Sequence, residues 1–112
     1  MTQALSDPPY VFHSDLVDRL APVPAGEIVS ELLHHDDHVK VTLLGCASGE
    51  QLAEQIASRS FILQVLAGEV RLVLAGDTVV AGSGSWMRMA PGQHEPITAV
   101  GEAILLLTLL KD

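Results

Sequence analysis

From Gly26 onward, short apolar runs alternate with turn residues, and no run keeps a 3.6-residue hydrophobic period for the length that a helix requires. Glycine, proline, serine and aspartate separate the runs, as they do in β proteins. We predict strands at Ile28–His34, His38–Leu44, Leu52–Ala57, Phe61–Leu66, Val70–Leu74, Thr78–Ala81, Trp86–Met89, Ile97–Val100 and Ala103–Leu110. Many short strands at this spacing are typical of an all-β sandwich or barrel.

The first 25 residues are predicted to be a lead-in segment that packs on a single domain of residues 26–112, because 112 residues suffice for one core. Ser14 is expected to cap a short helical turn through Leu20, since the prolines at 22 and 24 prevent its continuation. Tyr10 and Phe12 are expected to dock the lead-in on the domain.

Two of the predicted strands, Phe61–Leu66 and Ala103–Leu110, are apolar at nearly every position. A strand with this pattern is covered on both of its faces. A small barrel covers only the inner face, so a second copy of the chain is the simplest cover for the outer face. The pattern therefore predicts a homodimer.

Two stretches share their residue spacing with the cupin family. The first family motif, G-x5-H-x-H-x(3 or 4)-E-x6-G, is matched in spacing by Gly49–Gly68, and the second, G-x5-P-x-G-x2-H-x3-N, by Gly84–Ala99. The string VLAGEV at Val65–Val70 also resembles a turn of that family. The chain thus resembles a small single-domain cupin of the cupin-2 conserved-barrel kind. The resemblance implies an all-β, cupin-type double-stranded β-helix, or jelly-roll barrel, with a short N-terminal helical turn.

The resemblance does not extend to the residues that hold a metal ion in metal-binding cupins. Carried over by spacing, those positions hold Gln55, Ala57, Phe61 and Glu95. Two of the four have no donor atom, and a neutral amide is a poor ligand for Zn²⁺, Fe²⁺ or Ni²⁺. We therefore expect no metal and no cofactor. A one-residue bulge could place His94 where Glu95 is expected, which leaves a divalent metal held by His94, Gln55 or Glu95 as a weaker alternative.

Met87 and Met89 alternate in phase, and the motif register places them on the inner face of the barrel with Phe61. They would line an apolar pocket, with Gln55, His94 and Glu95 as its polar groups, which is the usual composition of a small-molecule site. The same side chains could equally fill a small barrel. Trp86 and Arg88 are expected on the opposite face.

The run His34-His35-Asp36-Asp37-His38 resembles metal-binding sequences. If Asp36 and Asp37 form a two-residue turn, His35 and His38 are cross-strand partners close enough to share an ion. A solvated hairpin tip explains the run as well, and we prefer that interpretation.

Fourteen acidic and six basic residues give the chain a net charge of −8, and only four aromatic residues are present. We therefore expect neither nucleic acid nor an anionic membrane as a partner. The longest nearly unbroken apolar stretch is too short for a membrane helix. The single cysteine, Cys46, excludes an intramolecular disulfide, so we expect a cytoplasmic protein in which Cys46 is a small buried hydrophobic residue.

Fold alone does not select a function, because cupins host many unrelated activities. The sequence favours a metal-poor homodimer that binds a small molecule. One alternative is a metal-dependent or acid–base enzyme of the isomerase or dioxygenase type that acts on a small polar substrate. In that alternative His94 or Glu95 is the general acid or base and Gln55 orients the substrate. The other alternative is a structural or interaction module with a filled barrel.

Overall fold

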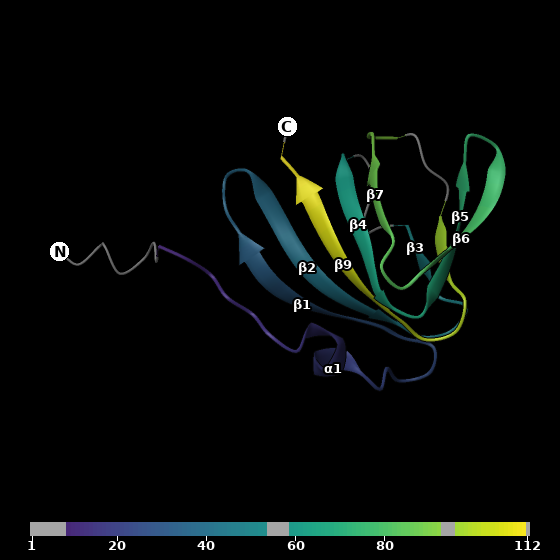
Figure 1. Cartoon of the computed structure of the whole chain (residues 1–112), viewed down its shortest axis with the longest axis horizontal. Coiled ribbons are helices and arrows are strands. Elements are labelled where there is room, and N and C mark those ends of the chain that lie inside the picture. The colour runs from purple at the N-terminus through teal and green to yellow at the C-terminus, as the bar shows by residue number, and fades with distance from the viewer. Residues whose placement is uncertain (1–8, 54–58, 93–95, 112) are drawn as a thin grey trace.

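The described part of the chain forms two facing antiparallel β-sheets and one short helix (Figure 1). The structure is a computed structural model that describes residues 9–53, 59–92 and 96–111. One sheet has the strand order β1-β2-β9-β4-β7 and the other β3-β8-β5-β6. The elements are α1 (Leu16–Leu20), β1 (Ile28–His35), β2 (Val39–Cys46), β3 (Gln51–Leu52), β4 (Phe61–Ala67), β5 (Glu69–Leu74), β6 (Asp77–Gly82), β7 (Trp86–Met89), β8 (Ile97–Ala99) and β9 (Ala103–Leu110).

The predicted strands are therefore present, with small shifts at their ends. The largest shift concerns the run predicted at Leu52–Ala57, where the described part is only the two-residue strand β3 and positions 54–58 lie outside the described residues. The motif glycines Gly49, Gly68, Gly84 and Gly92 all have positive φ angles. The two spacing patterns thus mark turns, as the resemblance implied. None of the described helices is long and apolar enough to cross a membrane.

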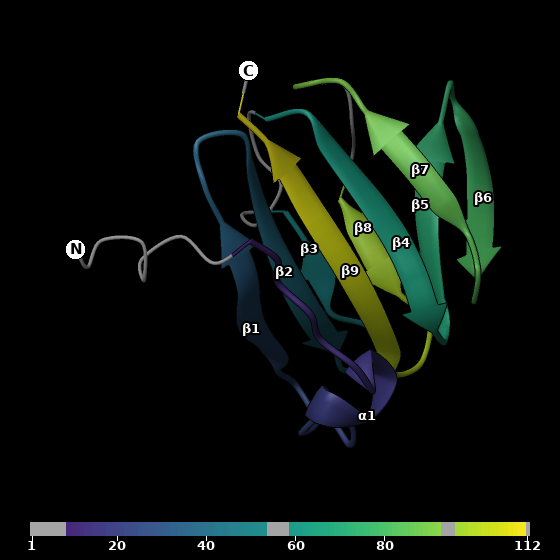
Figure 2. The ribbon, with the colours of Figure 1, turned by 60° about the vertical axis from the view of Figure 1, so that its left-hand side comes forward.

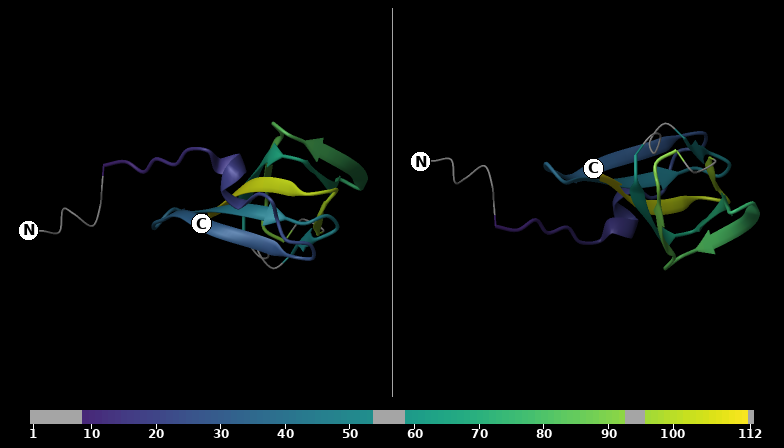
Figure 3. Two further views of the ribbon diagram at one scale, coloured as in Figure 1. Left: turned by 90° about the horizontal axis from the view of Figure 1, so that it is seen from below. Right: turned by 90° about the horizontal axis from the view of Figure 1, so that it is seen from above.

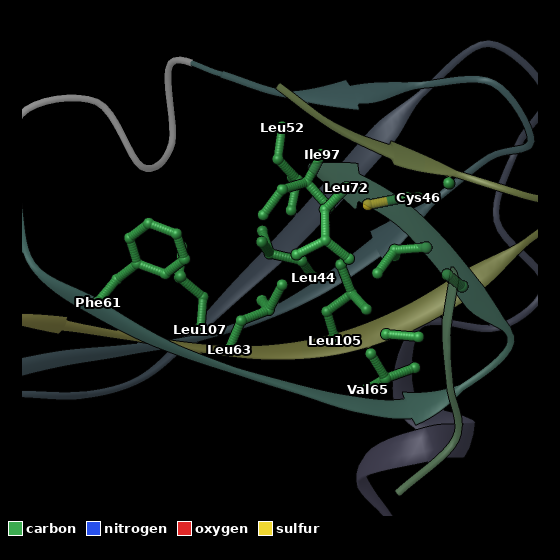
Figure 4. Packing of buried hydrophobic residues seen from close by; sticks show 14 residues of the cluster. Leu44, Cys46, Leu52, Phe61, Leu63, Val65, Leu72, Ile97, Leu105 and Leu107 are labelled. Carbon is green, nitrogen blue, oxygen red and sulfur yellow. The ribbon is translucent and has the colours of Figure 1, made fainter. Parts of the chain in front are cut away.

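The core lies between the two sheets and follows from the alternation of side chains along each strand. In β4, Phe61, Leu63 and Val65 are buried, while the residues between them are only half-buried. We call the face of the five-stranded sheet that carries these three residues its inner face, and the opposite one its outer face. Figure 4 shows inner-face side chains of β2, β4 and β9 packing against Leu52, Leu72 and Ile97 of the other sheet.

The N-terminal segment lies along the outer face of the five-stranded sheet (Figures 2 and 3). Leu16 and Leu20 of α1 pack with Val23 against Leu43 and Ile104 of the sheet. The outer face of β2 and β9 is therefore covered in part by the chain's own lead-in. The apolar pattern of β9 predicts that this face is covered, but it does not say whether the lead-in or a second chain covers it.

A glycine within β2 allows this close approach. A Cβ atom added to Gly45 would lie 2.8 Å from Val23 Cγ2 and 3.3 Å from Leu20 Cβ. Glycine within a strand often marks a place where another segment approaches closely. The backbone amide of Val23 also donates a hydrogen bond of 2.9 Å to Glu102 Oε1, which fixes the segment at the start of β9.

Two expectations for the lead-in were wrong. Ser14 does not cap α1: the N-cap is Asp15, in the left-handed region, without a side-chain cap, and the Ser14 hydroxyl donates to the Asp15 carboxylate. Tyr10 and Phe12 do not dock by burial, since they are 75% and 79% exposed. His13 instead forms a hydrogen bond of 2.9 Å with the Leu33 carbonyl of β1. A polar contact therefore holds this part of the segment.

Candidate functional site

Phe61, Met87 and Met89 lie together on the inner face, as the sequence predicts. Phe61 is paired with Met89 on one side and with Leu109 on the other. Phe61 is fully buried, whereas both methionines are partly buried and pack against the edge of the core cluster. The most accessible part of this group is therefore contributed by β7, at the edge of the sheet.

The polar members of the predicted pocket lie outside the described residues. Gln55, His94 and Glu95 belong to the segments 54–58 and 93–95, as does Ala57. Their roles as polar groups, metal ligands or acid–base groups remain predictions. Of the four positions that correspond to cupin metal ligands, the structure describes only Phe61, whose buried side chain has no donor atom.

The predicted pairing at the histidine-rich hairpin was wrong. His35 is paired with Lys40, and the turn is closed by a hydrogen bond from the Asp36 amide to the Val39 carbonyl, so Asp37 and His38 are its central residues. A bulge between Leu32 and His34 changes the register of β1. Nothing in the sequence identifies that bulge, and the expected His35–His38 pair does not form.

The hairpin tip is instead organised around one carboxylate. Asp36 accepts hydrogen bonds from the His38 and Val39 amides and lies 2.6 Å from His34 Nε2. The hydrogen bonds from His34 and then from the two amides lower the pKa of Asp36 well below its usual range. Among the residues that the structure describes, no three His, Cys, Asp or Glu side chains are grouped so that they could hold a metal ion.

Cys46 is buried in the core cluster, as predicted. Burial, with a smaller contribution from the nearby Glu50 carboxylate, raises the pKa of the Cys46 thiol to about 11. Because the thiolate is the nucleophilic form, this thiol is unreactive at neutral pH.

The sequence analysis missed a pocket on the inner face at the other edge of the same sheet. This pocket has a volume of about 160 Å³ and lies between β1, β2 and β9. Its lining residues are Ser30, Lys40, Thr42, Leu44, Leu107 and Leu109. A signal was present in the sequence: in the run Val39-Lys40-Val41-Thr42, the polar residues share the face of the inward-pointing Leu44.

A second pocket lies on the outer face, between the N-terminal segment and the sheet. It has a volume of about 510 Å³, and its lining includes Tyr10, His13, Leu33, Val41 and Leu106. The lead-in therefore does not pack closely on the sheet along its whole length. Part of the apolar outer face is left accessible beneath it.

The arrangement of the strands closely resembles solved structures of cupins. A cupin superfamily protein from Desulfitobacterium hafniense matches with a TM-score of 0.73 and 19% identity over 83% of this chain and 85% of its own. An RmlC-like cupin family protein with a double-stranded β-helix fold, from Methanocaldococcus jannaschii, matches with a TM-score of 0.65 and 17% identity over 93% and 90% of the two chains. The chain has the cupin fold.

KdgF from a Halomonas species shares this fold, with a TM-score of 0.67 and 13% identity over 76% of this chain and 81% of its own. No protein-family model matches the sequence, and no curated protein matches it significantly. At these identities the cupin likeness concerns the fold, and the function has to be argued from the residues.

Proposed function

We propose that this cupin-fold protein is a small-molecule-binding module whose ligand contacts Met87 and Met89 on the inner face. The observation that carries the proposal is the change in burial across this face. The side chains on the central strands β4 and β9, such as Leu63 and Leu105, are fully buried, but the two methionines on β7 are not. Flexible thioether side chains at a partly open position adapt well to a small apolar ligand.

The proposed site uses no transition metal. Of the positions that correspond to cupin metal ligands, the structure describes only that of Phe61, and the side chain of Phe61 is a hydrocarbon that cannot bind a metal. A site built on the remaining inherited positions would offer Gln55 and Glu95, fewer ligands than the three or four protein groups that such a metal normally requires. We also retain the cytoplasm as the proposed location, supported by the unpaired, buried Cys46.

A fragment screen with ¹³C-methyl-labelled methionine tests this function. We expect a subset of small carboxylic acids, sugars or aromatic compounds to shift the methyl resonances of Met87 and Met89 in metal-free protein. The indole N–H of Trp86, which lies on the outer face of the same strand, should not shift and serves as the control. Added Zn²⁺ should neither be required for binding nor raise the melting temperature by many degrees.

A specific observation favours a second candidate, the structural module with a filled barrel. Among the residues that the structure describes, fourteen buried ones form a single cluster between the two sheets. If no compound moves the Met87 or Met89 resonances, the methionines merely complete that cluster, and the small-molecule proposal is wrong. The inner-face side chains would then serve only to form the core and would bind no ligand.

We further propose that two copies associate through the part of the outer face that the lead-in leaves open. Trp86 on β7 is 60% exposed, and Ile62, on the neighbouring strand β4, is only half-buried on the same face. Tyr10 and Phe12 add exposed aromatic surface from the lead-in. Aromatic residues are enriched where protein surfaces associate. An interface of this kind would be isologous, with each copy contributing the same residues.

Sedimentation tests the proposed dimer. At micromolar concentration we expect a species of twice 11.9 kDa. Trp86→Ser should weaken the dimer about thirtyfold, since truncation of an interface tryptophan typically costs about 2 kcal/mol. Val80→Ser is the matched control, because Val80 is 53% exposed on the other sheet. A wild-type monomer, or equal weakening by both substitutions, would contradict the proposed interface.

A further inference from the structure

In the half of β2 next to the turn, the polarity of the two faces is inverted relative to the rest of the five-stranded sheet. Along β2, Lys40 and Thr42 share the inner face with the buried Leu44, while Val39 and Val41 point to the outer face. Elsewhere on the inner face of this sheet the side chains are apolar, as in Leu63 and Leu105. Lys40 and Ser30 are exposed and Thr42 is half-buried, so this end of the inner face is open to solvent and accessible to a polar ligand.

These inward-facing polar groups line the pocket of about 160 Å³ described above. Its floor is apolar and is formed by Leu44, Leu107 and Leu109, whereas Ser30 and Thr42 contribute hydroxyl groups and Lys40 an ammonium group. A cavity of about 150 Å³ accommodates a benzene ring. The pocket is therefore large enough for a compact apolar group, next to donors that can bind a polar one.

The charged side chain in the lining of this pocket is that of Lys40. Among the described residues, Lys40 forms no ion pair. Glu31 pairs with Arg19, and Asp36 pairs with His34. Lys111 also lies near, since its Nζ is 2.5 Å from Nε2 of His35, the cross-strand neighbour of Lys40. Lys40 and Lys111 thus lie at the same end of the sheet as the turn that contains Asp36 and Asp37.

We propose that this pocket binds a small organic carboxylate, with its apolar body on the three leucines and its carboxylate on Lys40 and the Thr42 hydroxyl. The site is distinct from the one at Met87 and Met89. Strands β1 and β2 lie at one edge of the sheet and β7 at the other, with β9 and β4 between them (Figure 2). The pocket and the methionine site can therefore be tested independently.

Benzoate is a suitable probe, because its ring fits the volume of the pocket and its carboxylate can be compared with the neutral hydroxymethyl group of benzyl alcohol. Titration of ¹⁵N-labelled full-length protein should shift the backbone resonances of Lys40 and Thr42 and give a dissociation constant. Lys40→Met keeps the aliphatic stem but removes the charge. We expect this substitution to weaken benzoate binding about fivefold, as for a solvent-accessible ion pair.

Arg71→Met on β5 is the matched control, since it removes an exposed positive charge from the other sheet and should leave benzoate binding unchanged. The effect of Lys40→Met should largely vanish at about 1 M salt, where the Debye length is about 3 Å. Equal binding of benzoate to wild type and Lys40→Met at low salt, equal binding of benzyl alcohol and benzoate, or no benzoate shift at Lys40 and Thr42 would each overturn the proposal. None of these results depends on the Met87 and Met89 resonances, which report on the other site.

Discussion

Phe61→Ala is expected to lower the free energy of unfolding by about 3–5 kcal/mol, the usual cost of removing a fully buried aromatic side chain. The ring has no exposed surface and lies on the inner face between Met89 and Leu109. Closing the resulting cavity would require movement of both neighbouring strands. Chemical denaturation should show a lower midpoint with an unchanged slope.

The other phenylalanine of the chain provides the control. Phe12 is 79% exposed, so Phe12→Ala should change the free energy of unfolding by less than about 0.5 kcal/mol. Phe61→Leu, which fills most of the volume, should cost less than about 1.5 kcal/mol. Comparable losses for Phe61→Ala and Phe12→Ala would show that the ring of Phe61 does not occupy the core position that the structure gives it.

The role of Phe61 also shows what the sequence could establish. Its phase with Leu63 and Val65, and that of Met87 with Met89, predicted the inner face correctly, because side-chain direction in a strand depends only on alternation. The motif glycines predicted the turns for an equally local reason, since a positive φ angle selects glycine.

The features that the sequence did not reveal depend on contacts between distant segments. The bulge between Leu32 and His34 redirects the hairpin, and the sequence contains no residue that marks it. The lead-in covers β2 and β9 because Gly45 leaves room for Val23, a fit between residues 22 positions apart. Gly45 in the middle of an apolar strand was the available signal, but a glycine alone does not say which segment approaches it.

Gly68→Ala is expected to be about as damaging as loss of the Phe61 ring, for a different reason. Gly68 joins β4 to β5 with a φ angle of 81°. An added Cβ atom would meet the Glu102 carbonyl oxygen and lie 2.9 Å from the Ala103 Cα atom, so backbone would have to move. We expect the free energy of unfolding to fall by about 3 kcal/mol or more. The unfavourable φ angle accounts for about 1–2 kcal/mol of this loss, and the steric clash accounts for the rest.

Gly76→Ala separates these two contributions. Gly76, before β6, has a φ angle of 86°, but nothing lies within 4 Å of an added Cβ atom. Its substitution should therefore lower the free energy of unfolding by only about 1–2 kcal/mol, which is the cost of the positive φ angle for alanine. Equal losses for the two variants, measured by chemical denaturation, would contradict the close approach of Gly68 to β9.

The clash at Gly68 should also be transmitted to the N-terminal segment. Glu102, whose carbonyl would have to move, accepts through its side chain the hydrogen bond from the Val23 amide. Displacing Glu102 weakens the contact that fixes the lead-in at the start of β9. Limited proteolysis should then cleave the lead-in faster in Gly68→Ala than in Gly76→Ala. If the two variants are cleaved at the same rate, the Glu102 hydrogen bond does not hold the segment, and its attachment depends on the other contacts, namely the apolar packing of Leu16, Leu20 and Val23 and the hydrogen bond of His13.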